Sequence, residues 1–267
     1  MASWRREGDL VVASPRWAEP HARRAFGDAL MPLRDVARPD EAGYLRAIEA
    51  AAPGERGGAP AGWRLVEERG EGRLTLRLWE NPAPERFAFD VVDAVEAGLA
   101  EVSWQSAGGE SLACPFGAAP PFDPFGHPPL SARRYVCGPE PWHSVSVTII
   151  DDASHRPRRC VYAPPPPAPW AAVTVRVRGL PATSLVVGHW GQPYLYDREG
   201  DEGDRVPATL ALRARGEEVG AIERRDGDGW ASFRIPLRSP PGDDGLSFRV
   251  SGEAAEGRPL CWEARLR

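Results

Sequence analysis

Lysine is absent from this sequence of 267 residues, so all 33 of its basic residues are arginine. The 38 acidic residues outnumber them, and the formal net charge is −5 at pH 7. A protein that binds the phosphate backbone of a nucleic acid needs a broad field of positive charge. The charge balance therefore gives no reason to expect a nucleic acid as a partner.

Long apolar runs are also missing. No segment approaches the roughly 20 consecutive apolar residues that a transmembrane helix needs. The first ten residues, MASWRREGDL, lack the apolar core of a signal peptide. We therefore expect no membrane span and no export signal within this chain. A start at Met1 directly before a strand-like segment also fits a fragment of a longer protein.

Familiar catalytic and nucleotide-binding motifs are absent as well. The chain contains no GxGxxG, GxxxxGK[ST], HExxH or GxSxG pattern, and its five histidines show no metal-ligand spacing. We expect no cofactor and no metal, and we assign no catalytic residue. The paired carboxylates of a glycosidase meet in space rather than in sequence. A glycan-active enzyme with carboxylates that cannot be identified here therefore remains an alternative.

The four cysteines contain no CxxC pair, so a zinc ribbon is not expected. An even number of cysteines in a β-rich chain allows two disulfides in an oxidising compartment. Cys160 stands at the entry to the predicted sandwich and Cys261 in its last strand, and first and last strands are often neighbours. This reasoning pairs Cys160 with Cys261 and Cys114 with Cys137. Four buried thiols in a cytosolic protein are the alternative.

The strongest pattern that is present lies in residues 209–237. Apolar residues alternate with polar ones at Leu210, Leu212 and Ala214, and again around Phe233 and Ile235. A period of two gives a strand one buried face and one solvated face. Similar alternation occurs at 145–149, 173–177, 246–250 and 260–266, with Gly- and Asp-rich turns between several of these segments. The pattern predicts a mostly β protein whose main part is a jelly-roll-like, antiparallel β-sandwich.

The N-terminal part has a different pattern. Residues 8–13 predict a strand, followed by a helix to about Phe26 and a second helix that begins at Pro39. Segments 63–66 and 74–78 predict a β-hairpin. Residues 1–83 are therefore expected to form a small α/β domain. The segment Asn81-Pro82-Ala83-Pro84 separates it from a jelly-roll-like β-sandwich domain at 86–267.

One stretch, GHWGQPYLYD at 188–197, combines aromatic rings with amide and imidazole groups. Flat rings cover the C–H groups of a sugar, and the polar tips bind its hydroxyls. The candidate ligand-binding residues are therefore His189, Trp190, Gln192 and Tyr194, with Trp230 as a lesser candidate. The alternative is a strand and turn whose aromatic side chains fill the sandwich core.

Two acidic segments invite comparison with calcium sites. Asp151-Asp152 could supply adjacent carboxylates to calcium, but the arginines that follow favour an ion-paired, solvated turn. The segment DGDG at 226–229 lacks the third ligand and the terminal Glu of an EF-hand, which favours a hairpin turn.

Several of these segments resemble a known family. DLVVASPRWAEPHARRAFGD, MPLRDVARPDEAGYLRAIE and GWRLVEERGEGRLTLRLWENPAP resemble the soluble region after the last membrane helix of bacterial glycosyltransferases of the dolichyl-phosphate-mannose mannosyltransferase type (family 39). VSVTIIDDASHRPRRCVYAPPP, GHWGQPYLYDR, RDGDGWASFRIPL and LCWEARLR resemble the galactose-binding-like jelly roll appended to some of them.

The resemblance implies an extracytoplasmic position on the periplasmic side of a membrane. In that family the catalytic acid lies between the first membrane helices, and the lipid-linked sugar donor binds at the membrane. This chain is expected to contain neither the catalytic acid nor the donor site, because it has no predicted membrane helix. The expected function is a non-catalytic region that positions a glycan or lipid-linked sugar acceptor beside a membrane-embedded partner or a missing transmembrane region. A stand-alone carbohydrate-binding or adhesion module is the alternative.

Overall fold

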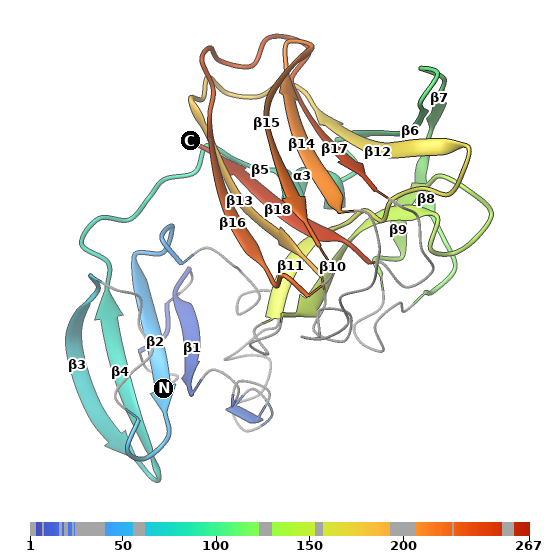
Figure 1. Ribbon diagram of the computed structural model, residues 1–267. Helices are drawn as coiled ribbons and strands as arrows, with labels where there is room; N and C mark the ends of the chain where they lie inside the picture. The colour runs from blue at the N-terminus through green and yellow to red at the C-terminus, as the bar shows by residue number, and fades with distance from the viewer. Residues whose placement is uncertain are drawn as a thin grey trace. The chain divides into compact units, whose positions relative to one another are not determined.

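The computed structural model describes residues 4–6, 8–15, 18, 21–22, 24, 41–55, 62–122, 130–152, 157–192, 207–225, 227–252 and 259–267. The chain divides into two compact units (Figure 1). The smaller unit contains Met1–Arg86 and Ser154–Arg158, and the larger contains Phe87–Ala153 and Arg159–Arg267.

The smaller unit is built on a four-stranded sheet in the order β1-β2-β4-β3. Strand β1 (Leu10–Ser14) runs parallel to β2 (Arg46–Ala51), and the other pairs are antiparallel. Strands β3 (Arg64–Glu71) and β4 (Leu74–Glu80) form the predicted hairpin, which is confirmed. Gly72 has a φ of 65° in its turn, a conformation that suits a residue without Cβ.

The helix predicted to begin at Pro39 is wrong where the structure describes it, because Arg46–Ala51 form β2. Ile48 packs on one face of this strand, and Ala47 packs on the other. A strand that is buried on both faces shows no alternation of buried and solvated residues, so this short segment cannot be told from a helix by periodicity. The helix expected before Phe26 lies mostly outside the described residues.

The larger unit contains two sheets. The six-stranded sheet is antiparallel throughout and has the order β15 (Glu217–Arg224), β14 (Ala208–Ala214), β17 (Leu246–Ser251), β12 (Trp170–Val177), β6 (Glu101–Ser106) and β7 (Ser111–Ala113). The eight-stranded sheet has the order β16 (Ala231–Pro236), β13 (Leu185–Gly191), β18 (Cys261–Leu266), β11 (Pro157–Tyr162), β10 (Ser144–Asp151), β9 (Arg133–Val136) and β8 (Phe116–Ala118), and β5 (Phe89–Asp90) also pairs with β18.

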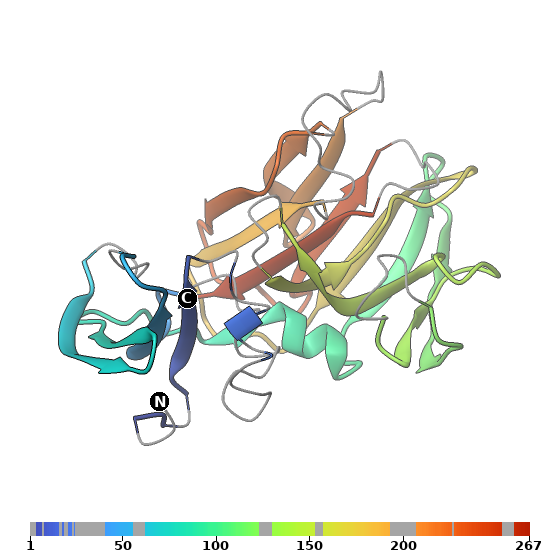
Figure 2. The same cartoon turned by 90° about the horizontal axis from the view of Figure 1, so that it is seen from below.

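The chain passes repeatedly from one sheet to the other. Strands β11, β13, β16 and β18 belong to the eight-stranded sheet, whereas β12, β14, β15 and β17 belong to the six-stranded sheet. Such crossing between two packed antiparallel sheets is typical of a jelly roll. The predicted mostly β sandwich is therefore confirmed. A short helix, α3 (Val91–Glu96), packs against β10 and β18, and Figure 2 shows it beside β18.

The core lies between the two sheets and is built by the alternation seen in the sequence. Leu210, Leu212 and Phe248 are at most 2% exposed and project into it from the six-stranded sheet. Trp190 and Trp262 fill it from the eight-stranded sheet, each with no exposed surface. The rings of Phe248 and Trp262 stack with centroids 4.5 Å apart, which joins the two layers.

Both predicted disulfides are present. Cys160–Cys261 joins the neighbouring strands β11 and β18, and Cys114–Cys137 closes a shorter loop. The pairing expected from the positions of the first and last strands is therefore confirmed. None of the described helices has the length and apolar character that a membrane crossing requires.

Candidate ligand-binding site

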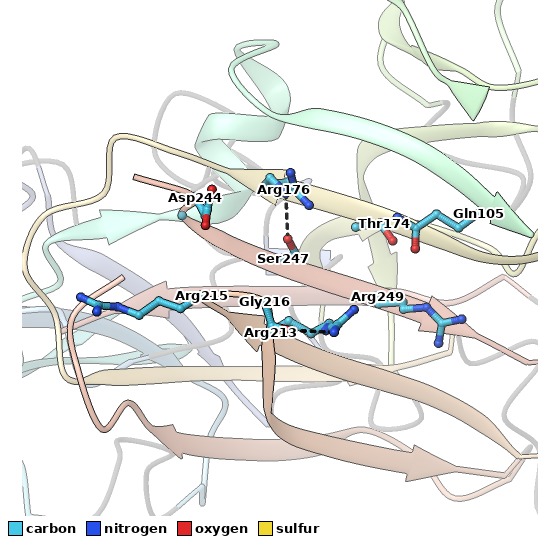
Figure 3. A pocket seen from close by; sticks show the side chains of 10 residues that line it. Gln105, Thr174, Arg176, Arg213, Arg215, Gly216, Asp244, Ser247 and Arg249 are labelled. Atoms are coloured by element: carbon cyan, nitrogen blue, oxygen red, sulfur yellow. Dashed lines mark hydrogen bonds between the residues drawn. The ribbon is translucent and has the colours of Figure 1, made fainter. Parts of the chain in front are cut away.

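A groove lies on the solvent-facing side of the six-stranded sheet, the side away from the core. Its volume is about 200 Å³. Figure 3 shows the side chains that line it, most of which project from four neighbouring strands. The lining residues are Gln105 from β6, Thr174 and Arg176 from β12, Arg213 from β14, Ser247 and Arg249 from β17, and Arg215, Gly216, Asp244 and Gly245 from two turns.

The register of the strands decides which of these residues are neighbours. Ser247 stands opposite Arg176 on one side and opposite Arg213 on the other. Adjacent strands are about 4.8 Å apart, so the backbones of these two arginines lie about 10 Å apart across Ser247. Arg249 stands opposite Thr174 in the next row that faces the groove. Three arginines from three strands therefore share one surface.

The hydrogen bonds of these arginines go to neutral oxygens. The Nε atom of Arg176 donates to Oγ of Ser247 at 3.1 Å, and an Nη of Arg213 donates to the carbonyl oxygen of Gly216 at 2.6 Å. The Nε atom of Arg215 donates to the carbonyl of Pro240 at 3.1 Å. Among the described residues, Arg249 has no hydrogen-bond partner, and none of the four guanidiniums forms an ion pair with a carboxylate.

Several arginines elsewhere in the larger unit are paired with carboxylates, whereas Arg134 donates to the backbone carbonyl oxygens of Ser131 and Pro120. Arg159 lies 2.8 Å from a carboxylate oxygen of Asp93 and 2.5 Å from one of Glu96. Arg265 and Arg178 form comparable contacts with Asp90 and Glu101, at 3.1 and 2.9 Å. The groove differs because four arginines gather in its lining, where Asp244 is the single acidic residue among those that the structure describes. It is a positively charged surface on a chain whose net charge is −5.

One polar group in the floor of the groove is unsatisfied. Thr174 is 6% exposed, and its buried Oγ1 has no hydrogen-bond partner in the described part of the chain. Leaving a buried hydroxyl unpaired is unfavourable by about 1–3 kcal/mol. This oxygen has almost no accessible surface, so a ligand would reach it only after the side chains around it move.

Two neighbouring turns lie at one end of the groove. Arg215 and Gly216 have φ values of 51° and 79° in the tight turn between β14 and β15, the left-handed backbone that twisted hairpins favour. Gly245 also has a positive φ, of 70°, and a Cβ there would lie 1.8 Å from the carbonyl oxygen of Val177. Only glycine permits this close approach of the backbones of β12 and the turn before β17.

The described residues of the predicted sugar site lie elsewhere in the sandwich. His189 and Trp190 are consecutive in β13, so their side chains point to opposite faces of the sheet. Trp190 has no exposed surface and is a core residue, as the alternative interpretation of this stretch expected. Tyr194 lies outside the described residues.

His189 occupies the outer face of the eight-stranded sheet. Its Nδ1 atom lies 2.6 Å from a carboxylate oxygen of Glu263, which is 2% exposed. Near the end of the same strand, Nε1 of Trp230 donates to the backbone oxygen of Gln192 at 2.7 Å. The structure does not bring these side chains to the arginine-lined groove. A ligand-binding role for His189, Gln192 and Trp230 stays a prediction.

Metal-binding groups of three or more His, Cys, Asp or Glu side chains do not occur among the residues that the structure describes. The adjacent carboxylates of Asp151 and Asp152 thus have no third acidic, histidine or cysteine ligand within those residues. The groove itself was not predicted from the sequence. In the sequence, three of the segments that alternate between apolar and polar residues carry an arginine at a polar position. These arginines form one surface only in a particular order of the strands, which the sequence does not show.

Comparison with known proteins does not identify a family for this chain. No protein-family model matches the chain, and no curated protein matches it. The resemblance to family 39 mannosyltransferases is therefore not accompanied by a family match. A solved structure that is similar is that of the tandem CBM51 modules of a family 98 glycoside hydrolase from Streptococcus pneumoniae SP3-BS71. The TM-score is 0.34 at 8% sequence identity, over 73% of this chain and 55% of that chain.

Proposed function

We propose that this chain is a non-catalytic binding module that holds a glycan on the solvent-facing side of its six-stranded sheet. The observation that carries the proposal is the groove lined by side chains of β6, β12, β14 and β17. The opposite face of the same sheet is packed into the core, which fixes the strands. A site built on rigid strands keeps its hydrogen-bonding groups in one geometry.

The chemistry of the lining suits a carbohydrate. The amide of Gln105 and the hydroxyls of Thr174 and Ser247 can each donate and accept, as sugar hydroxyls also do. Each guanidinium adds up to five donors in a planar fork. None of the described residues that line the groove is aromatic, so a sugar there would be held by hydrogen bonds rather than by ring stacking. An open groove across several strands also suits a chain-like ligand.

The two disulfides support an extracytoplasmic location for this function. Disulfides persist in secreted, periplasmic and surface proteins, whereas the thiols of most cytosolic proteins stay reduced. Both bridges lie within the sandwich unit that carries the groove. An extracytoplasmic module would meet glycans of the cell envelope or its surroundings.

A more specific form of the proposal is that the module belongs to a membrane glycosyltransferase system and positions an acceptor glycan beside a membrane-embedded partner. Its support is the family resemblance of the N-terminal segments and of the sandwich. About ten segments of transmembrane length, encoded in frame upstream or in the adjacent gene, are expected if it is correct. Their absence would leave the stand-alone carbohydrate-binding or adhesion module.

Glycan-array binding by the full chain tests the proposal. We expect a set of bound glycans whose signal is lost in the double variant Arg176→Ala/Arg249→Ala. Arg234→Ala is the matched control, because Arg234 is an exposed arginine on β16 of the other sheet. It should retain full binding.

The rival site on the eight-stranded sheet is tested in the same experiment with His189→Ala and Trp230→Ala. Loss of binding in these variants, with binding intact in the arginine double variant, would transfer the site to that sheet. Turnover of a bound glycan by the isolated chain would instead favour the enzyme alternative. A wild-type chain that binds no glycan would overturn the proposed function.

A further inference from the structure

The groove has a net positive charge, and none of its four arginines forms an ion pair with a described carboxylate; from this we infer that its ligand is an acidic glycan bearing carboxylate or sulfate groups. The inference rests on the proposed function and narrows it to one class of ligand. Four arginines and one aspartate line the groove, which gives a formal charge of +3 there against −5 for the whole chain.

The cost of covering these arginines separates acidic from neutral ligands. A ligand that lies over the groove removes water from the guanidiniums, and burying a charge without a counter-charge is strongly unfavourable. A neutral sugar returns only dipolar hydrogen bonds. A carboxylate or sulfate returns charge-assisted and bidentate bonds, which are roughly twice as strong as neutral ones. The same groove should therefore discriminate against the uncharged form of a given polymer.

The arginines are available for such contacts. Arg249 uses none of its five donors within the described part of the chain. Arg176 uses its Nε for Ser247, and no described residue accepts from its two terminal nitrogens. In Figure 3 the side chains of Arg215, Arg213 and Arg249 follow one another along the face, with Arg176 beside them. This spread arrangement fits several acidic groups along one chain better than it fits a single small anion.

Thr174 lies beside the same arginines in the lining of the groove. The hydroxyl of Thr174 is buried, lines the groove and lacks a hydrogen-bond partner among the described residues. It stands opposite Arg249 in the strand register. A sugar whose acidic group binds Arg249 would bring its own hydroxyls close to Thr174. The unsatisfied group and the unpaired charge therefore lie in the same part of the groove.

The test compares polymers that differ only in charge. The full chain is titrated with dextran and dextran sulfate, and with polygalacturonate and its methyl ester. We expect each acidic polymer to bind about tenfold or more tightly than its neutral counterpart, since one charge-assisted contact is sufficient for that factor. Raising the salt from about 0.1 M to about 1 M should weaken the binding, because the Debye length falls from about 10 Å to about 3 Å.

The variants assign the effect to the groove. Arg249→Gln should weaken binding of the acidic polymers about tenfold without affecting the fold, since the described structure gives Arg249 no hydrogen bond or ion pair to lose. Arg249→Lys should recover part of the affinity, because it restores the charge but not the planar fork. Arg234→Gln removes the same charge from the other sheet and should change nothing.

The outcomes separate this inference from the proposed function. If the chain binds each acidic polymer and its neutral counterpart equally well, the inference of an acidic ligand is overturned. The proposed function as a glycan-binding module is then unaffected. If the chain binds none of the four polymers and no glycan on the array, both the acidic ligand class and the proposed function are overturned. Polyglutamate or duplex DNA that binds as tightly as the acidic polymers, with the same loss in Arg249→Gln, overturns the glycan assignment and makes the groove a general polyanion surface.

Discussion

Removal of the two disulfides should destabilise the sandwich by different amounts. The perturbations are the double variants Cys160→Ala/Cys261→Ala and Cys114→Ala/Cys137→Ala. All four cysteines are buried, with exposures of 0% for the first pair and 5% and 6% for the second. Alanine avoids burying a hydroxyl at these sites. Because the loss of side-chain packing is similar, the comparison reports mainly on how each bridge restrains the unfolded chain.

The expected magnitudes follow from the sequence separations of the bridges, which are 101 and 23 residues. A cross-link removes more entropy from the unfolded chain when it closes a longer loop, and the chain-entropy relation gives about 4.7 kcal/mol for the long loop and about 3.4 kcal/mol for the short one. The Cys160–Cys261 variant should therefore lose about 1.3 kcal/mol more than the Cys114–Cys137 variant.

Urea unfolding followed by near-ultraviolet circular dichroism measures the difference. The free energies extrapolated to water should be compared rather than the midpoints, because removing a cross-link expands the unfolded state and raises the m-value. Titration of thiols in the denatured wild type should find none free. An equal loss in the two variants, or a larger loss for Cys114–Cys137, would refute the loop-entropy reasoning, and four free thiols would refute the bridges themselves.

Two further predictions concern the packing around the core. Gly188→Ala should lower the free energy of unfolding by about 3 kcal/mol or more, because its Cβ would lie 2.1 Å from the carbonyl oxygen of Glu263. Thermal unfolding measures the effect. Gly117→Ala is the control and should change the stability little, because no atom lies within 4 Å of the Cβ it adds. Burial lowers the pKa of His143, so the unfolded chain binds this proton more readily, and stability should fall as the pH drops through about 6.5. His143→Gln should reduce that slope between about pH 7 and pH 5, and an unchanged slope would contradict the assignment.

The sandwich was predictable where a strand has one solvated face. A few residues are enough to predict which face of β14 is buried. Leu210 and Leu212 lie on one side of the strand, and Thr209 and Arg213 lie on the other. The same rule failed at β2, where Ala47, Ile48 and Glu49 are all fully buried and the strand has no solvated side. Tertiary burial on both faces erased the signal there, and the spacing of apolar residues imitated a helix.

The aromatic stretch in β13 illustrates a different limit. Its composition resembles a sugar site, and composition alone drew His189 and Trp190 into one group. The alternation of a strand places adjacent side chains on opposite faces, so the two could not both face one ligand. Val186 and Trp190 share the core-facing side, and both have no exposed surface. Applying the strand period to the candidate residues themselves would have separated the core tryptophan from the surface histidine.

The groove lay beyond the reach of the sequence because its charge is a property of strand order. Arg176, Arg213 and Arg249 are tens of residues apart, and each is an ordinary polar position on an alternating strand. They form one surface only because β17 lies between β12 and β14 and aligns Ser247 with both of the outer arginines. With β17 at an edge of the sheet, Arg249 would no longer stand between them. Gly245 allows the turn before β17 to approach the end of β12 closely, because a Cβ at this position would lie 1.8 Å from the carbonyl oxygen of Val177. The selectivity inferred for acidic ligands therefore depends on pairing between distant strands.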